Sequence, residues 1–525
     1  MSAHKHPRVR KAPRFVGLAI ILGMTLALTA PIGTSPAGAT PAPGWTAYVV
    51  SESPDTVTPI DTATNTPGTP IPVGSSPLSI AITPNGASAF VADFGDNTLT
   101  FINTATNTSS TAAKVPTPIA VAISPNGPGP AYGVYVANFG TNTVSTNTSS
   151  TPITVGPNPH GIAITPNGET AYVTDAGNNT VTPIDTATNT AGPPITVGNE
   201  PIGIAITPNG KTAYVADAGS NTVTPIDTAT NTAGPPITVG GPGYIAIAPN
   251  GATAYVTSAT GITPIDTATN TPGPSIVVAA GPNGIAITPD GAAAYVTGGS
   301  NTVTPIDLAT NTAETPITVG GQPVAIAITP DQAPVAHLSV TPAVAGQATS
   351  FDASASTVAV GTISTYAWKF GDGSTATTST PTITHTYAAT GRFTATVTET
   401  DSAGTSTTQV FTGQTMSRNG GPSALASQSF TLPLTIATTS VPPGMVGIHY
   451  STTLQASGGT PPYKWSIVSG SPPTGLLLRR GTGILTGKPT STGTFTFTVQ
   501  VVDHKTTTKP HTQNSATATF SLTIS

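Results

Sequence analysis

Cysteine is absent from the 525 residues, and charged residues make up only 7% of them. Without cysteine the chain has no disulfide framework, no thiolate nucleophile and no Cys-ligated metal, so packing and strand pairing must stabilise it. No long apolar run follows residue 30, and nothing later in the chain predicts a membrane-spanning helix. Glycine and proline are abundant instead, with 55 and 54 residues. This composition is typical of short strands joined by many turns.

The first 39 residues show the three parts of a secretory signal peptide. Residues 1–14 carry five Lys or Arg and no acid, residues 15–30 form an apolar run, and Ala37-Gly38-Ala39 fits the small-x-small cleavage pattern. The apolar run is shorter than the ~20 residues that a spanning helix needs, which disfavours a retained membrane anchor. We therefore expect an exported mature chain without a transmembrane segment.

A unit of about forty residues recurs between about residues 47 and 332, and residues 201–240 are a clear copy of it. Each unit holds four short runs rich in β-branched residues, bounded by Gly, Asn or Pro, and none shows a 3.6-residue apolar period. Pro208-Asn209-Gly210 joins the first two runs as a tight hairpin. Four strands in forty residues predict one blade of a β-propeller.

Two series of residues count the blades. The second-strand aromatic residue occurs seven times, at Tyr48, Phe90, Tyr135, Tyr172, Tyr214, Tyr255 and Tyr295. The first-strand run also occurs seven times, at Ile80, Val121, Ile162, Ile204, Ile245, Ile285 and Ile326. The region begins on a second strand and ends on a first strand. We therefore predict a closed seven-bladed ring in which residues 326–329 pair beside residues 47–51.

The third strand of most units contains a proline, at positions 59, 183, 225, 264 and 305. Proline cannot donate a ladder hydrogen bond, so we infer that the missing donors point toward the outermost strand, which should be short and frayed. The same strand ends in an Asp or Asn, at Asp61, Asn103, Asp185, Asp227, Asp266 and Asp307. Capping of the next backbone amides by this side chain explains its position without a metal. The loop acids Asp93, Asp96, Asp175 and Asp217 lack the dense clustering of a hard-cation site, so we expect neither a metal nor a cofactor.

One position just before each first strand should lie near the mouth of the central channel. It is occupied by Leu78, Ile119, His160, Ile202, Gly243, Asn283 and Val324. His160 is the only histidine of the propeller region and could act as a general base if a carboxylate lay close by. Glu200, just before the equivalent position of the next unit, is the candidate partner. We predict a binding role for this ring and assign no catalytic residue.

The repeat resembles the YVTN family of β-propellers, through AYVTD-x-G-x-N-TVTPIDTATNT-x-x-PITVG-x-x-P-x-x-IAITPNG. The resemblance implies a secreted or cell-surface propeller of the kind common in surface-layer and adhesin-like proteins, and it implies no chemistry. Propeller lyases and lactonases collect several His, Glu, Asp and Asn side chains at the axis, and this sequence does not supply such a set. Two departures stand out: the third unit is compressed between Val144 and Pro152, losing its PIDTATN segment, and a later loop is only Ser258 to Gly261.

Residues 333–414 resemble a polycystic kidney disease (PKD) domain through the Trp368-Lys369-Phe370-Gly371-Asp372-Gly373 stretch. Trp368 and Phe370 alternate on one strand face and should anchor a sandwich core, while the Gly-Asp-Gly segment supplies a hairpin turn. Asp372 and His385 are interpreted as turn and packing residues.

Residues 415–432 are predicted to be a flexible linker. After them, residues 433–525 resemble the Ig-like modules of bacterial surface proteins through Gly458-Gly459-Thr460-Pro461-Pro462-Tyr463-Lys464-Trp465 and Gly493-Thr494-Phe495-Thr496-Phe497-Thr498-Val499. Trp465 is the expected core aromatic residue. The predicted fold class is therefore all-β: a signal peptide (1–39), a closed seven-bladed propeller (40–332) and two β-sandwich domains.

Charge is unevenly distributed along the chain. Residues 40–332 hold 2 Lys and 16 Asp or Glu, a net charge of −14, whereas residues 433–525 have a net charge of +5. An acidic propeller argues against nucleic acid or an anionic membrane as its partner. We expect a secreted or cell-surface adhesion or recognition protein whose partner is an extracellular polysaccharide, a cell-wall component or a surface protein. The alternatives are an extracellular propeller enzyme (lyase, lactonase or glycan-active) and a structural surface-layer component.

Overall fold

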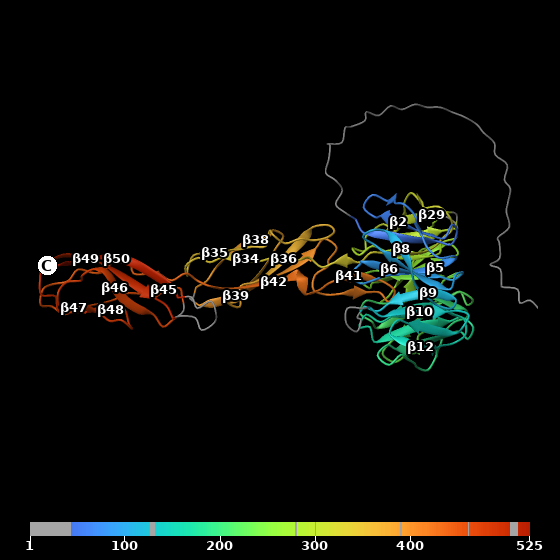
Figure 1. Ribbon diagram of the computed structural model, residues 1–525, viewed down its shortest axis with the longest axis horizontal. Helices are drawn as coiled ribbons and strands as arrows, with labels where there is room; N and C mark the ends of the chain where they lie inside the picture. The colour runs from blue at the N-terminus through green and yellow to red at the C-terminus, as the bar shows by residue number, and fades with distance from the viewer. Residues whose placement is uncertain are drawn as a thin grey trace, which may run out of the picture. The chain divides into compact units, whose positions relative to one another are not determined.

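The computed structural model describes residues 44–125, 132–278, 281–299, 301–388, 391–459, 461–504 and 513–525. The predicted signal peptide lies outside these residues. Within them, the region up to Ile328 folds into seven antiparallel sheets, coloured blue to yellow-green in Figure 1. The first strand of each sheet contacts the first strands of the sheets on either side, around to the start, so the seven sheets form a ring around one channel.

The strands of the seven blades follow one order from the channel outward. The first strands are β32 (Pro323–Ile328), β5 (Pro77–Ile82), β9 (Pro118–Ile123), β13 (Pro159–Ile164), β18 (Pro201–Ile206), β23 (Ile245–Ile247) and β27 (Ile285–Ile287). The second strands are β1 (Thr46–Ser51), β6 (Ser88–Asp93), β10 (Val134–Asn138), β14 (Thr170–Asp175), β19 (Thr212–Asp217), β24 (Thr253–Ser258) and β28 (Ala293–Gly298). The third strands are β2 (Thr56–Asp61), β7 (Thr98–Asn103), β11 (Thr143–Thr146), β15 (Thr180–Asp185), β20 (Thr222–Asp227), β25 (Gly261–Asp266) and β29 (Thr302–Asp307). We number the blades 1 to 7 in this order.

Blade 1 is built from both ends of the propeller region. Its first strand β32 pairs antiparallel with β1, with Val49 opposite Ile326. The backbone N–H of Glu52 extends this pairing by donating to the carbonyl of Gln322, with an N to O distance of 2.9 Å. The predicted closure of a seven-bladed ring is therefore confirmed, and the ring has no open strand edge at its two ends.

The outermost strands confirm the prediction from proline. In the five blades whose third strand contains proline they are two-residue pieces: β3 (Thr66–Pro67), β4 (Ile71–Pro72), β16 (Thr190–Ala191), β17 (Ile195–Thr196), β21 (Thr232–Ala233), β22 (Ile237–Thr238), β26 (Thr271–Pro272), β30 (Thr312–Ala313) and β31 (Ile317–Thr318). In blades 2 and 3, which lack that proline, they are continuous: β8 (Thr108–Lys114) and β12 (Ser149–Thr154). The carbonyl of Pro225 accepts a 2.7 Å bond from the outer Gly234, so an N–H at residue 225 would also face outward.

Neighbouring blades are joined by apolar side chains and by one repeated polar contact. Each joint buries Val, Ile and Ala side chains from two adjacent sheets. At five joints of the described propeller, the hydroxyl of a second-strand tyrosine also contacts the asparagine side chain in the turn after the third strand of the next blade. The oxygen-to-oxygen distances are 2.9 Å (Tyr48 to Asn107), 3.5 Å (Tyr135 to Asn189), 2.7 Å (Tyr172 to Asn231), 2.6 Å (Tyr214 to Asn270) and 2.6 Å (Tyr295 to Asn65). We call this contact the tyrosine–asparagine bond.

The PKD-like part is a β-sandwich. One sheet contains β34 (Ser339–Thr341), β35 (Ala348–Asp352) and β38 (Thr382–Thr386), and the other contains β37 (Thr375–Thr378), β36 (Ile363–Lys369), β39 (Arg392–Asp401) and β42 (Leu425–Thr431). Trp368 and Phe370 are 1% and 2% exposed in the core between them, as predicted. Gly371 and Gly373 have φ angles of 87° and 95°, which the turn between β36 and β37 requires.

The C-terminal part is a second sandwich. Its strands are β43 (Thr435–Ile436), β44 (Tyr450–Thr453), β45 (Ala456–Ser457), β46 (Lys464–Gly470), β47 (Leu476–Leu478), β48 (Ile484–Gly487), β49 (Gly493–Val502) and β50 (Ser515–Ile524). Trp465 is buried in its core together with Phe497, which confirms the expected core aromatic residue.

The predicted flexible linker at residues 415–432 is wrong. These residues form β41 (Met416–Asn419), a 3-10 turn (Pro422–Ala424) and β42, which pairs along the whole N-terminal half of β39 and completes a PKD sheet. The alternating pattern of β42 is short and polar on one side. The stretch before it, Ser417-Arg418-Asn419-Gly420-Gly421, is typical of a loop. Only the pairing with β39 therefore determines that β42 is a strand.

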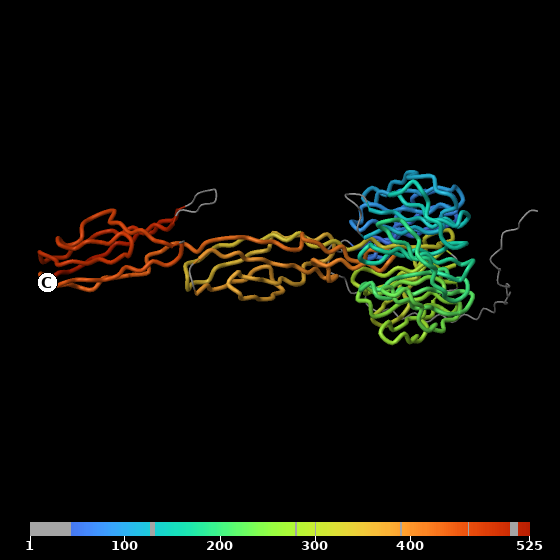
Figure 2. Tube along the Cα trace, turned by 90° about the horizontal axis from the view of Figure 1, so that it is seen from below, coloured from blue at the N-terminus to red at the C-terminus, as the bar shows by residue number. Residues whose placement is uncertain are grey.

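A hairpin from this segment contacts the propeller channel. Strand β40 (Val410–Phe411) pairs with β41, and β41 pairs in parallel with β33 (Asp331–Gln332), where the chain leaves the propeller. Phe411 and Met416 are 2% and 1% exposed, and both belong to the apolar cluster of blades 3 and 4. In Figures 1 and 2 this orange segment lies against the propeller, near the label β41 of Figure 1. We call residues 410–419 the channel hairpin.

Candidate functional site

A pocket of about 70 Å³ lies in the channel, and its walls come from the starts of the first strands. Four of the seven predicted mouth residues line it: Leu78, Ile119, His160 and Ile202. Tyr244 and Gly284 represent two further blades, whereas Gly243, Asn283 and Val324 do not line the pocket. Neighbouring first strands approach closely here: a Cβ added to Gly161 would lie only 2.3 Å from the carbonyl oxygen of Ile202. The predicted ring is therefore a narrow pocket that combines apolar side chains with exposed polar atoms.

His160 lies on β13 and is only partly exposed within this pocket. Burial lowers the pKa of His160 to about 4, so its imidazole is neutral near neutral pH. Glu200, its candidate partner, is exposed in the turn before β18 and does not line the pocket. No carboxylate is among the lining residues, so His160 lacks the partner that would orient or charge a general base there.

Gln414 was not found from the sequence, although it lines the channel pocket. It lies at the tip of the channel hairpin, and its Nε2 donates to the carbonyl of Ile204 over 2.6 Å. The tip is held by two further bonds, from the N–H of Ile164 to the carbonyl of Gly413 (2.7 Å) and from the N–H of Ile206 to the carbonyl of Thr412 (3.2 Å). An amide side chain therefore joins the apolar residues of the channel and offers both a donor and an acceptor.

Three buried acids of the propeller accept hydrogen bonds from threonines of their own blade. Asp93, at the end of β6, is fully buried, and its Oδ2 accepts from the hydroxyls of Thr98 (3.2 Å) and Thr100 (2.6 Å). Burial raises the pKa of Asp93 to about 6 despite these bonds, and the same arrangement recurs at Asp175 and Asp217. Asp96 instead is exposed and accepts from Ser75.

The Asp or Asn at the end of the third strand caps the following turn, as predicted. In blade 5, Oδ1 of Asp227 accepts from the backbone N–H of Ala229 (3.0 Å) and Thr230 (2.9 Å). The residues that the structure describes contain no group of three or more His, Asp or Glu arranged to hold a metal ion.

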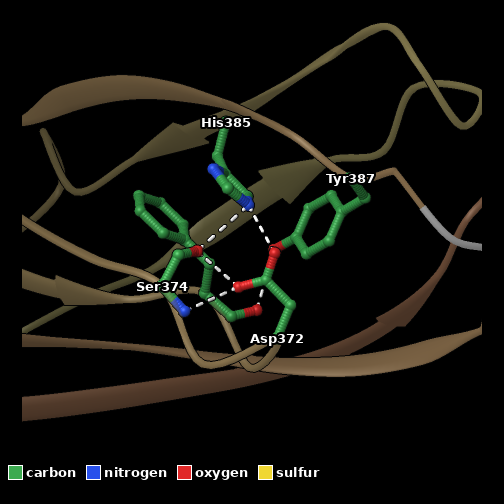
Figure 3. A network of polar contacts seen from close by, with 5 residues as sticks. Asp372, Ser374, His385 and Tyr387 are labelled. Atoms are coloured by element: carbon green, nitrogen blue, oxygen red, sulfur yellow. Dashed lines mark hydrogen bonds and ion pairs between the residues drawn. The ribbon is translucent and has the colours of Figure 1, made fainter.

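A polar network in the PKD-like sandwich is shown in Figure 3. His385 Nε2 lies 2.7 Å from Asp372 Oδ2 and 3.2 Å from the hydroxyl of Ser374, which also donates to Asp372. Burial would raise the pKa of Asp372, but the bonds from Ser374 and His385 lower it to about 2. One histidine nitrogen thus faces both partners, whereas a Ser-His-Asp triad uses the two ring nitrogens separately. The network fits the turn role inferred for Asp372 and His385, with His385 stacked on Phe370 at 4.2 Å.

A buried carboxyl pair lies where the chain leaves the propeller. Asp331 and Asp401 are each 1% exposed, and Asp331 Oδ1 accepts from the indole N–H of Trp45 over 3.1 Å. Asp401 Oδ1 accepts from the backbone N–H groups of Ala403 and Thr405. Burial, followed by the neighbouring Asp331 carboxyl, raises the pKa of Asp401 to about 7. The pair is therefore most stable when it carries a proton.

Comparison with protein families finds two matches. Residues 331–415 match the PKD domain, and residues 429–525 match the family described as "Putative Ig domain". Comparison with curated protein sequences finds no match. No helix in the described residues has the length and hydropathy needed to cross a membrane.

Solved structures with a similar fold cover about half of the chain. A functionally unknown protein from Desulfotomaculum acetoxidans is 20% identical, with a TM-score of 0.45 over 54% of this chain and 98% of its own. A protein described as "putative 6-phosphogluconolactonase" from Bacteroides uniformis is 18% identical, with a TM-score of 0.46 over 54% and 99%. A Lactobacillus plantarum protein is 16% identical, with a TM-score of 0.46 over 54% and 99%.

Proposed function

We propose that this chain, a seven-bladed propeller followed by a PKD domain and an Ig-like domain, is a secreted or cell-surface adhesion or recognition protein. A propeller combined with PKD and Ig-like modules is an organisation typical of surface proteins, and such modules are characteristic of extracellular proteins. In this proposal the propeller binds an extracellular polysaccharide, a cell-wall component or a surface protein, while the two sandwiches display it.

The size and chemistry of the channel pocket carry the proposal. Its volume of about 70 Å³ lies well below the about 300–1,000 Å³ that is usual for small-molecule sites, so it suits one projecting group of a large partner. Its walls present polar and apolar atoms in similar measure, its titratable side chains are His160 and Tyr244, and His160 is neutral. These features support recognition of an uncharged group, such as a substituent of a neutral sugar or an apolar side chain.

Charge supports the same class of partner. The propeller region has a net charge of −14, which opposes binding to nucleic acid and to anionic lipid. The turns around the ring are rich in Thr, Asn and Ser, which offer uncharged donors and acceptors to a sugar polymer or a polypeptide.

An array of glycans and cell-wall polymers, probed with the mature chain (residues 40–525), tests the proposal. Ile202→Lys introduces a charge at the pocket, and Ile448→Lys is the matched control because Ile448 is 61% exposed in the Ig-like domain. We expect saturable binding that falls at least about tenfold in the Ile202 variant and is retained in the control. Binding that is equal in all three proteins, or absent from every polymer and surface-protein preparation, contradicts the proposal. Concentration-dependent self-assembly without such binding would indicate a structural surface-layer component instead.

A further inference from the structure

The joint between blades 2 and 3 departs from the others in both of its partners. Phe90 occupies the position of the second-strand tyrosine and has no hydroxyl to donate. Blade 3 lacks the Asp-Thr-Ala-Thr-Asn turn that would accept, and the short loop between β11 and β12 carries Asn147 instead. Asn147 is engaged within its own blade, since its Oδ1 accepts from the N–H of Val134 (2.8 Å) and its Nδ2 donates to the carbonyl of Tyr132 (2.9 Å). This joint therefore cannot form the tyrosine–asparagine bond.

The missing turn leaves Phe90 uncovered. The six tyrosines at the equivalent position are at most 5% exposed, whereas Phe90 is only half-buried. Phe90 is held in place by an edge-to-face contact with Phe101, with ring centroids 5.7 Å apart. Phe101 stands where five other blades have proline, and the continuous outer strand β8 follows from it. Phe90 in place of tyrosine and Phe101 in place of proline thus both alter the outer side of the joint between blades 2 and 3.

A pocket with a volume of about 390 Å³ occupies this place. Phe90, Leu99 and Val115 from blade 2 and Val134 and Val136 from blade 3 contribute apolar walls. The volume lies in the range of about 300–1,000 Å³ that is usual for small-molecule sites, and it is several times that of the channel pocket. The pocket can hold a body of one or two rings.

Besides its apolar walls, the pocket has one charged lining residue. Lys114, at the end of β8, lines the pocket and is exposed. It is one of only two lysines, with Lys211, among residues 40–332, where the net charge is −14. A cation beside an apolar pocket on an otherwise acidic propeller is complementary to a ligand that carries a single negative charge.

We propose that this pocket, formed where blade 3 lacks its turn, binds a small amphipathic anion: an aromatic or branched apolar body with one carboxylate. The apolar body contacts Phe90 and the valines of the two blades, and the carboxylate pairs with Lys114. This site lies outside the channel and is independent of the polymer-binding role proposed above.

Two probes with the same ring system and similar size test the proposal on residues 40–525. Naphthalene-2-carboxylate has the stated charge, and 2-naphthalenemethanol is its uncharged counterpart. We expect saturable binding of both by calorimetry or ligand-observed NMR, with the carboxylate about threefold to fivefold tighter, as an exposed ion pair provides. Lys114→Gln should abolish that preference, while the control Lys211→Gln, which removes the other lysine, should retain it.

A third variant tests the apolar part. Ala113 is exposed on β8 and lines the pocket, so Ala113→Phe should fill part of the pocket and weaken both probes by at least about tenfold. An unchanged circular dichroism spectrum and melting temperature show that this variant is folded. Absence of saturable binding by the wild-type chain, or equal binding by the Ala113 variant, overturns the site; a carboxylate preference that survives Lys114→Gln overturns the assigned role of Lys114.

Discussion

The blade joints of the propeller and the channel hairpin both combine apolar packing with hydrogen bonds, but they differ in how often they occur. The tyrosine–asparagine bond is made at five joints, always from the same two positions of the forty-residue unit. The channel hairpin occurs once, and its carbonyls accept from Ile164 and Ile206 in two different blades. A repeated contact leaves a periodic pattern in the sequence, whereas a contact made once leaves none.

Removing the aromatic anchor of the channel hairpin should have the largest effect. Phe411 is 2% exposed among propeller side chains, so Phe411→Ala should lower the free energy of unfolding by about 3–4 kcal/mol. Denaturant unfolding of residues 40–525, followed by tryptophan fluorescence, measures this loss. Gln409→Ala is the control, because Gln409 is exposed just before the hairpin. Equal stability of the two variants would show that the hairpin does not anchor in the propeller.

The carboxyl pair beside the hairpin should make stability depend on pH. Because the pKa of Asp401 is raised to about 7 in the folded chain, its contribution is fully present below about pH 4 and is lost as the pH rises through 7. Asp93 and Asp217 act in the same direction, but their pKa values are about 6. The wild type should therefore still lose stability between pH 6 and 8, by on the order of 2 kcal/mol.

Asp401→Asn should flatten this part of the profile, since the amide stays neutral at every pH. Thermal unfolding at half-unit intervals from pH 4 to 8 gives the measurement. Asp61→Asn serves as the control, because Asp61 is exposed and Asn103 occupies its position in blade 2. A slope above pH 6 that is the same in both variants would assign the dependence to other groups.

Joints with the tyrosine–asparagine bond and the joint at Phe90 should respond differently to the removal or addition of one hydroxyl. Tyr214→Phe removes the 2.6 Å bond to Asn270 and should cost about 1 kcal/mol of unfolding free energy. The reverse change, Phe90→Tyr, adds a hydroxyl at the joint without an accepting turn and should change stability by less than about 0.5 kcal/mol. Paired denaturant titrations compare them, and a stabilising Phe90→Tyr would show that the blade 3 loop can accept after all.

The smallest effect should come from restoring a backbone donor. Pro225→Thr supplies an N–H that faces the outer strand of blade 5. In blade 2, which has no proline at this position, the outer strand β8 pairs continuously. We expect a stability change within about 0.5 kcal/mol, together with slower amide exchange at residues 232–234, 237 and 238. Unchanged exchange there would mean that the outer strand is split for another reason.

Sequence reasoning predicted more of the fold than of the site. The split outer strands followed from the prolines at positions such as 225, and the closure followed from the unmatched ends at Tyr48 and Ile326. At the channel mouth, four of the seven ring positions line one pocket, and the binding role inferred for them stays a prediction. Glu200 was wrongly considered as a partner of His160, because proximity along the chain does not determine on which side of a turn a residue lies. Gln414 carried no signal, since its segment matches no pattern of the repeat.

By itself, the sequence determined the all-β class, the seven blades, their closure and the two aromatic sandwich cores, because each depends on local periodicity or on motifs that recur within the chain. Only the tertiary structure decided that residues 410–432 form a hairpin and a strand, that Gln414 lines the channel, and that Phe90 borders a pocket. The physical reason is the same in each case. These features arise where segments distant in the chain meet once, and the free energy of such a contact depends on the shape of both partners rather than on the pattern of either.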